Sequence, residues 1–283
     1  MLFKFKFVTL HSKLMRSVKI KEVIDALERF APLPLQEDYD NAGLQVGLTE
    51  TEVSGALLCL DVTEQVIDEA ISLGCNLIVA HHPLIFRKLA QISDANFVQR
   101  IVMRAIKNNI TIVSMHTNID AAAGGVNFKI AEKLGLNDVR FFGKKQSVIV
   151  ENTEVKGGEG VIGTFAQPIA ADDLILMLKR IFAVECIQAN QLLRREIKTI
   201  ALCGGAGSFL LENAISEGAD AFITGEMHYH DYFGHDQEIQ ICAIGHYQSE
   251  QFTNEIFKEI IESHCPNVTC FMTKVNTNPI IYL

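Results

Sequence analysis

Short apolar runs alternate along the chain with amphipathic segments that have helical spacing. Residues 76–80 and 111–115 are runs of the kind found in strands that are buried on both faces. Between them, residues 96–107 carry apolar side chains at the spacing of a helix that packs one face against a core. This order of strand, helix and strand predicts βαβ units.

The predicted elements fall into two groups that are separated near residue 140. The first group consists of helices at 18–30, 63–74, 96–107 and 126–134, strands at 53–60, 76–80 and 111–115, and a structured loop at 37–47. The second group consists of strands at 161–165, 184–187, 197–202, 221–224, 239–244 and 268–271, and helices at 171–182 and 248–263. Residues 140–160 differ in composition from the segments on either side, because polar residues and a Gly157-Gly158 turn separate short β-like runs. We therefore interpret them as a linker.

We therefore expect an α/β fold of two βαβ-type lobes, with mixed, largely parallel sheets flanked by helices. The expected division is an N-terminal tail at 1–17, a first lobe at 18–140 and a second lobe at 141–283. Residues 1–14 resemble neither a signal peptide nor a transit peptide, and Met15 opens a more conventional start. Our hypothesis is that residues 1–14 are dispensable.

Composition narrows the class of protein. The net charge of -9 and the pI near 5.5 argue against a broad nucleic-acid surface. Seven cysteines form no CxxC pair, which favours reduced thiols and a cytoplasmic location. No apolar run approaches the roughly 20 residues that a membrane span needs, so no membrane partner is expected.

The apolar run at 76–80 ends in His81 and His82, which Pro83 follows. The carboxyl ends of parallel strands are where such sheets bind ligands, and imidazole is the commonest protein ligand for transition metals. Consecutive side chains of a regular strand point to opposite faces, but Pro83 redirects the backbone and relaxes this restriction. Taken alone, the motif more often marks surface or capping histidines, so the other strand ends must decide.

Three further strand ends carry candidate ligands, which are His116 and Asp120, then Glu226, His228, His230 and Asp231, and finally His246 and Glu250. His246 and Glu250 are four residues apart, so on a helix both side chains face the same side. Histidines buried at random in a core would not gather at strand ends so regularly. The pattern favours a metal site over isolated histidines.

Imidazole and carboxylate ligands without a thiolate motif suit Zn, Mn, Fe, Co or Ni. The ligands exceed what one open catalytic zinc uses, so two divalent metal ions with a bridging carboxylate are expected, and hydrolysis is their default chemistry. The turn at 204–208 can either cradle a phosphate or serve as a tight turn between strand and helix. Asp61 is interpreted as a helix cap, and a nucleophilic role for Ser249 is not favoured.

Six motifs in order resemble the Nif-three-like family, whose bacterial members are commonly labelled GTP cyclohydrolase I type 2 homologues. They are EDYDNAGLQVG at 37–47, IVAHHPLIF at 78–86, SMHTNIDAAAGGVN at 114–127, CGGAGS at 203–208, ITGEMHYHD at 223–231 and GHYQSE at 245–250. The resemblance runs from about residue 18 to residue 283. Tyr39 replaces the usual Trp, His228 stands at an often basic position, and 140–160 is too short for the domain that many relatives insert.

The resemblance implies a dinuclear metal site in the cleft between the lobes, held by His81, His82, Asp120, His246 and Glu250. Glu250 or Asp120 would bridge the ions. His116 and His230 would lie near the site, in the outer coordination sphere or facing the substrate, and are the candidate catalytic residues. The resemblance also implies a toroidal homohexamer.

Two hypotheses of function follow. In the first, the protein is a metal-dependent hydrolase of a nucleotide or a related small molecule, with GTP cyclohydrolase as the named candidate and His116 or His230 carrying protons. In the second, it is a non-catalytic metal-binding protein with an oligomeric or regulatory role. DNA binding is disfavoured by the negative net charge of the chain.

Overall fold

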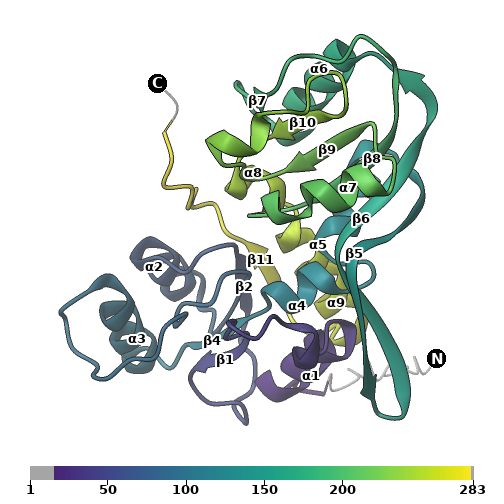
Figure 1. Ribbon diagram of the computed structural model, residues 1–283. Helices are drawn as coiled ribbons and strands as arrows, with labels where there is room; N and C mark the ends of the chain where they lie inside the picture. The colour runs from purple at the N-terminus through teal and green to yellow at the C-terminus, as the bar shows by residue number, and fades with distance from the viewer. Residues whose placement is uncertain (1–15, 282–283) are drawn as a thin grey trace, which may run out of the picture.

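Two mixed β-sheets, each flanked by helices, organise the chain in the computed structural model, which describes residues 16–281 (Figure 1). The α/β class with two mixed sheets is therefore confirmed. The hypothesis about residues 1–14 falls outside the described residues. Among residues 16–281, no helix is long and apolar enough to cross a membrane.

The first sheet has the spatial order β1 (Gly43–Val46), β4 (Thr111–Ser114), β3 (Leu77–Ala80), β2 (Ala56–Cys59) and β11 (Cys270–Met272). Its helices are α1 (Ile20–Phe30), α2 (Glu64–Leu73), α3 (Phe97–Lys107) and α9 (Thr253–His264). β1 is antiparallel to β4, and the other pairs are parallel. Side chains alternate between the faces, so Leu57 packs toward α2 and α3 while Leu58 packs toward α1 and α9. Burial on both faces explains why β2 and β3 are apolar at every position.

The second sheet has the spatial order β5 (Asn137–Val150), β6 (Thr153–Ile169), β8 (Ile197–Cys203), β9 (Ala221–Thr224), β10 (Gln240–Ala243) and β7 (Gln188–Ala189). β8, β9 and β10 are parallel, whereas β5, β6 and β7 pair antiparallel with their neighbours. The remaining helices are α4 (Thr117–Ala121), α5 (Val126–Leu134), α6 (Ala171–Phe182), α7 (Leu211–Ser216) and α8 (His246–Glu250), with 3-10 turns η1 (Leu33–Leu35), η2 (Ser208–Leu210) and η3 (Tyr229–Tyr232). One apolar core joins side chains of both sheets with those of α1, α5, α6 and α9.

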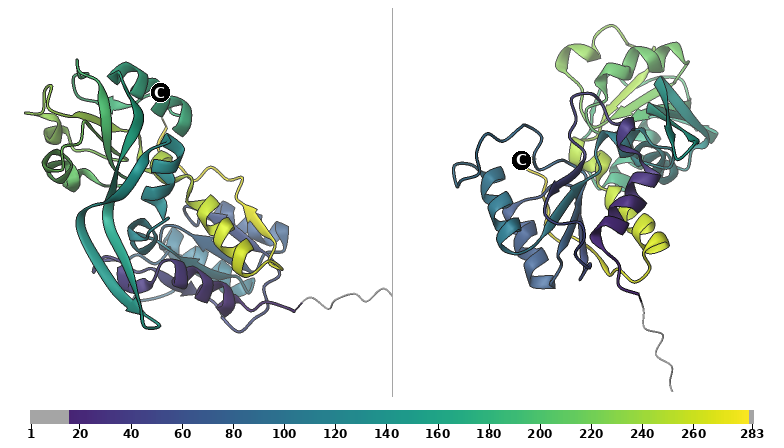
Figure 2. Two further views of the ribbon diagram at one scale, coloured as in Figure 1. Left: turned by 90° about the vertical axis from the view of Figure 1, so that its right-hand side faces the viewer. Right: turned by 90° about the horizontal axis from the view of Figure 1, so that it is seen from below.

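The interpretation of residues 140–160 as a linker is wrong, because β5 and β6 form a long hairpin that extends to the side of α1 (Figure 2). Its turn lies at Glu151 and Asn152, which have φ values of 48° and 64°. Gly157 and Gly158 belong to β6. A Cβ at Gly158 would lie 2.8 Å from Phe141, so this glycine permits a close cross-strand approach and makes no turn.

Other boundaries also differ from the sequence-based expectation. The loop at 37–47 contains strand β1, and the helix expected at 248–263 consists of two helices, α8 and α9. The chain returns to the first sheet at its end, where β11 pairs with β2 and α9 packs against α1 (Figure 1). The division into lobes at 18–140 and 141–283 stays a prediction. Helix α8 lies on the path of the chain from β10 of the second sheet to α9, which packs against the first sheet.

Candidate metal centre

His81 and His82 follow β3 at the carboxyl end of the first sheet. The Nδ1 atom of His81 lies 2.9 Å from the carbonyl oxygen of Met115, to which it donates because a carbonyl only accepts. The Nδ1 atom of His82 lies 2.8 Å from Asp61 Oδ1. The two ring centroids are 4.7 Å apart. Both Nδ1 atoms are thus engaged and both Nε2 atoms are left free, as is typical of metal-ligating histidines.

His116 and Asp120 come from the end of β4. Helix α4 starts directly after His116 and places Asp120 Oδ1 3.7 Å from His81 Nε2. The Nδ1 atom of His116 lies 2.8 Å from Asp40 Oδ1. The ligand atoms of His116 and of the two histidines after β3 all lie within 4.8 Å of one another. The end of β4 therefore brings a carboxylate and a third imidazole to the same place.

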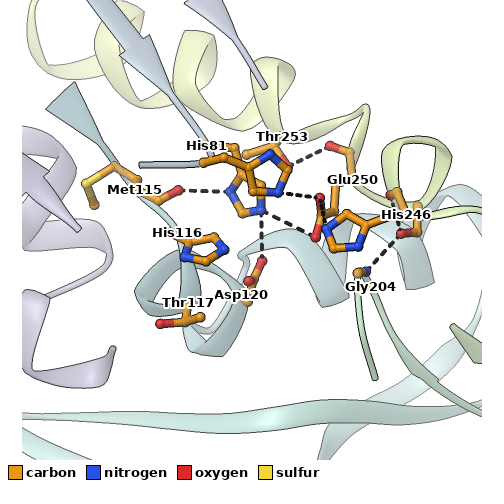
Figure 3. A network of polar contacts seen from close by, with 12 residues as sticks. His81, Met115, His116, Thr117, Asp120, Gly204, His246, Glu250 and Thr253 are labelled. Carbon is orange, nitrogen blue, oxygen red and sulfur yellow. Dashed lines mark hydrogen bonds and ion pairs between the residues drawn. The ribbon is translucent and has the colours of Figure 1, made fainter. Parts of the chain in front are cut away.

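The second sheet adds His246 and Glu250 through α8, which follows β10. His246 Nδ1 lies 2.8 Å from Glu226 Oε1, and its Nε2 lies 3.3 Å from Glu250 Oε2. An oxygen of Glu250 also lies 3.5 Å from His81 Nε2 (Figure 3). The other oxygen lies 3.0 Å from His82 Nε2. A single buried carboxylate therefore stands where ligands from both sheets meet.

These residues fit a divalent cation. Six side-chain atoms are buried and have no hydrogen-bond partner among residues 16–281, and four of them belong to this group, namely His81 Nε2, His82 Nε2, Asp120 Oδ1 and Glu250 Oε2. A metal that binds N and O ligands at about 2.0–2.2 Å separates two of its ligands by roughly 3.0–3.5 Å. The distances from Glu250 to the three histidines fall in this range. Buried atoms without hydrogen bonds, spaced as the ligands of one ion would be, make a group that could hold a metal.

The charges of the group also suit a cation. Burial lowers the pKa of His82, but the neighbouring carboxylates of Asp61 and Glu250 outweigh burial and raise it to about 10. Burial alone would raise the pKa of Glu250, yet the surrounding imidazoles hold it well below its usual range. Burial, with the nearby charge of Glu250, raises the pKa of Asp120 well above its usual range. The carboxylate of Glu250 is thus held ionised by positive charge, which a metal ion can supply in place of protons.

A cavity of about 230 Å³ opens over the cluster and is lined by Asp120, His116, His246 and Glu250. Tyr39 and Phe209 also line this cavity and are largely exposed. The Cys203 thiol faces the cavity too, and burial raises its pKa far above the usual range. Cys203 therefore stays a thiol at neutral pH, and its sulfur belongs to none of the groups of candidate ligand atoms among the described residues.

Of the two roles expected for residues 204–208, the hydrogen bonds favour the tight turn between strand and helix. Backbone N–H groups of Gly204, Gly205 and Gly207 donate to side-chain oxygens of Asn127, Ser249 and Thr224 at 2.8, 2.9 and 3.0 Å. Those donors are no longer available to a phosphate. Gly205 has a φ of +62°, and a Cβ there would lie 2.4 Å from Glu250 Oε1, so only glycine leaves room for this carboxylate.

His230 and His228 lie apart from this cluster. His230 is exposed in η3, where its ring contacts those of Tyr229 and Phe233. His228 is exposed and pairs with Asp231 at 3.2 Å. Of the two candidate catalytic histidines, the structure brings His116 into contact with the cluster. The catalytic role of His230 stays a prediction.

Three carboxylates hold the Nδ1 atoms of histidines in this cluster, namely Asp61, Asp40 and Glu226, and the sequence pattern assigned only Glu226 to the site, as a candidate ligand. The interpretation of Asp61 as a helix cap is wrong, because the Thr63 side chain caps α2. The available signal was position, since Asp61 follows β2 as Glu226 follows β9. An acidic residue directly after a parallel strand is placed to reach a ligand on the neighbouring strand.

Known proteins share this sequence and this fold. The sequence profile of the family described as Duf34/NIF3 (NGG1p interacting factor 3) matches residues 18–279. The chain is 33% identical over 238 residues to the GTP cyclohydrolase 1 type 2 homolog of Clostridium acetobutylicum, covering 83% of this chain and 86% of the relative. It is 31% identical over 271 residues to the protein of the same name from Lactococcus lactis, covering 93% and 98%.

Solved structures agree. A Staphylococcus aureus hypothetical protein superposes with a TM-score of 0.85 at 26% identity, over 95% of this chain and 100% of that chain. A Bacillus cereus protein related to NIF3 shows the same fold with a TM-score of 0.82 at 24% identity, over 95% and 100%. With the family profile spanning nearly the whole described chain, the protein belongs to the Duf34/NIF3 (NGG1p interacting factor 3) family.

Proposed function

We propose that the chain binds two divalent metal ions, which His82 and His246 hold on one side and His81 and Asp120 on the other. Glu250 is common to both groups of ligand atoms, and within each group all atoms lie within 4.8 Å of one another. This shared, buried carboxylate is the observation that carries the proposal, because a single open metal site does not need five ligands. The donor set suits Zn, Mn, Fe, Co or Ni.

The reaction that such a centre supports best is hydrolysis of a small molecule. When bound, a metal pair activates water at neutral pH and stabilises the negative charge that develops on reacting oxygens. Burial raises the pKa of Asp40, but hydrogen bonds from His116 and Thr117 outweigh burial and lower it to about 2. Asp40 therefore stays ionised and accepts a hydrogen bond from the Nδ1–H of His116, which leaves the Nε2 atom of His116 to act as the proton carrier.

A nucleotide is the proposed substrate class. The curated relatives carry the name GTP cyclohydrolase 1 type 2 homolog, which makes GTP the first candidate. The exposed rings of Tyr39 and Phe209 at the cavity offer faces on which a planar base can stack. The homohexamer and the cytoplasmic location stay predictions, and a solution mass near the 31.4 kDa of one chain would exclude the hexamer.

The test combines metal content with product release. Metal-reconstituted protein is assayed for bound metal and for formate and dihydroneopterin triphosphate from GTP, beside Glu250→Ala, His116→Ala and His230→Ala. We expect Glu250→Ala to lose both metal and turnover, and His116→Ala to keep metal and lose turnover. Two metals per chain without turnover would exclude GTP and favour the alternative, a non-catalytic metal-binding regulatory protein. Fewer than one metal per chain would refute the metal centre itself.

A further inference from the structure

The segment after β11 runs back past the candidate metal centre. It leaves the first sheet and rises toward the half of the molecule that carries α8 (Figures 1 and 2). Its start is anchored, because the Thr273 N–H donates to the Leu58 carbonyl at 2.9 Å and the Lys274 N–H donates to Glu69 Oε1 at 3.0 Å. Further along, Ile280 lines a cavity of about 380 Å³ together with Glu226 and His246.

Between these points, Thr277 contacts the carboxylate that holds His82. The Thr277 hydroxyl donates to Asp61 Oδ2 at 2.8 Å, while Asp61 Oδ1 lies 2.8 Å from His82 Nδ1. Each oxygen of Asp61 is thereby used, one toward the C-terminal segment and one toward the imidazole. On the other side of the ring, His82 Nε2 is buried without a hydrogen bond, 3.0 Å from Glu250 Oε2.

Asp61 needs this second contact to hold one orientation. More than a third of its side chain is exposed, so water can compete for its oxygens. Without the hydroxyl of Thr277, the carboxylate can rotate about its Cβ–Cγ bond, and the ring of His82 loses a fixed partner. Outer partners of ligating histidines contribute to metal affinity because they fix the tautomer and the direction of the ligand atom.

We propose that Thr277 is a positioning residue of the metal centre. Through Asp61 it holds the His82 imidazole so that Nε2 points at the ion that this ring would share with His246 and Glu250. The C-terminal segment is then a part of the metal site, although it supplies no ligand. This inference rests on the proposed metal centre.

The matched variants are Thr277→Val and Thr273→Val in the full chain. Both remove a hydroxyl that donates to a carboxylate, but the partner of Thr273 is Glu69, which contacts no candidate ligand among the described residues. Dissociation constants for Zn²⁺ are measured by competition with a chromophoric chelator. We expect Thr277→Val to weaken binding roughly 3- to 10-fold, the factor for one lost hydrogen bond. Thr273→Val should lower the thermal midpoint and bind Zn²⁺ like the wild type.

Two further measurements separate positioning from general loosening. Thr277→Ser keeps the hydroxyl and should restore wild-type affinity, and the absorption spectrum of the Co²⁺ form should change in Thr277→Val and not in Thr273→Val. In an Asp61→Ala background, which itself costs about 10- to 100-fold, Thr277→Val should add no further loss.

The outcomes distinguish the two proposals. If the wild type binds Zn²⁺ and Thr277→Val binds it with the same affinity, the role of Thr277 is overturned and the metal centre is retained. Equal losses in Thr277→Val and Thr273→Val, or a full additional loss in the Asp61→Ala background, also overturn it. Wild-type protein that binds no divalent metal overturns both.

Discussion

The two ends of the parallel strands differ in whether their polar side chains have hydrogen-bond partners. At the carboxyl ends of β3, β4 and β10, ligand atoms of His81, His82, Asp120 and Glu250 are buried without hydrogen bonds. At the amino end of β9, the Asp220 carboxylate accepts from the N–H groups of Lys198 and Thr199 at 2.9 and 2.8 Å and pairs with Arg195.

This difference suggests that the amino end of β9 contributes to stability and that the carboxyl ends of β3, β4 and β10 are available to a ligand. A buried polar atom without a partner costs about 1–3 kcal/mol, whereas a hydrogen bond to a charged group stabilises by about 1.5–3 kcal/mol. Asp220 therefore anchors the sheet. The cluster around Glu250 leaves buried side-chain atoms without hydrogen bonds, which the proposed metal ions would bind, so substitutions at the two ends should have separable effects.

The largest expected effect is the loss of metal in Glu250→Gln. The amide keeps the volume of the side chain but removes the charge that both groups of ligands share, so bound metal should fall below one ion per chain. Metal content after desalting, measured by mass spectrometry, checks this result. The control is Glu259→Gln, since Glu259 is exposed and pairs with Lys129 on the neighbouring α5. A Glu250→Gln protein with the wild-type metal content would contradict the bridging role.

Asp220→Ala should have the opposite signature. Removing the carboxylate leaves two N–H groups and Arg195 without their acceptor, so the free energy of unfolding should fall by about 2–3 kcal/mol. Metal content should stay that of the wild type. Urea unfolding checks the stability, with exposed Asp236→Ala as the control that should change little. Loss of metal in Asp220→Ala would show that the two ends are not independent.

Gly205→Ala separates backbone strain from displacement of a ligand. Gly205 and Gly218 both have positive φ, at 62° and 75°, so alanine should cost each about 1 kcal/mol of stability. A Cβ at Gly205 would meet Glu250 at 2.4 Å, whereas a Cβ at Gly218 has nothing within 4 Å. Gly205→Ala should therefore weaken Zn²⁺ binding by about tenfold or more, and Gly218→Ala should not. Equal Zn²⁺ affinities in the two variants would contradict the claim that Glu250 needs the space that glycine leaves at position 205.

The smallest expected effect is a pH dependence at the anchoring end. Burial would raise the pKa of Asp220, but its backbone and Arg195 hydrogen bonds outweigh burial and lower it below its usual range. A carboxyl whose pKa is lowered by folding adds stability above its unfolded pKa of about 3.9 and loses it as the pH falls through the folded value. The stability gap between wild type and Asp220→Asn should thus be constant from pH 6 to 8 and narrow below about pH 4. Unfolding in the presence of a chelator measures this gap, and a gap that widens on acidification would contradict the assignment.

Local sequence signals predicted much of the fold. The helices at 126–134 and 171–182 and the strand at 221–224 have the predicted limits, because helical spacing of apolar side chains, short apolar runs and turn residues act within a few residues. The hairpin of β5 and β6 was missed for a tertiary reason. Gly157 and Gly158 look like a turn, yet they are required by the contacts of β6 with Ala121 and Phe141.

The sequence by itself determined which side chains stand at the ends of the strands, and His81, His82, Asp120, His246 and Glu250 do meet there. Only the tertiary structure decided which way their rings point. The Nδ1 partners Asp61, Asp40 and Glu226 lie 21, 76 and 20 residues away from His82, His116 and His246. No local period encodes such pairs, because they form only when separate strands end side by side and one buried carboxylate is left to join two sheets.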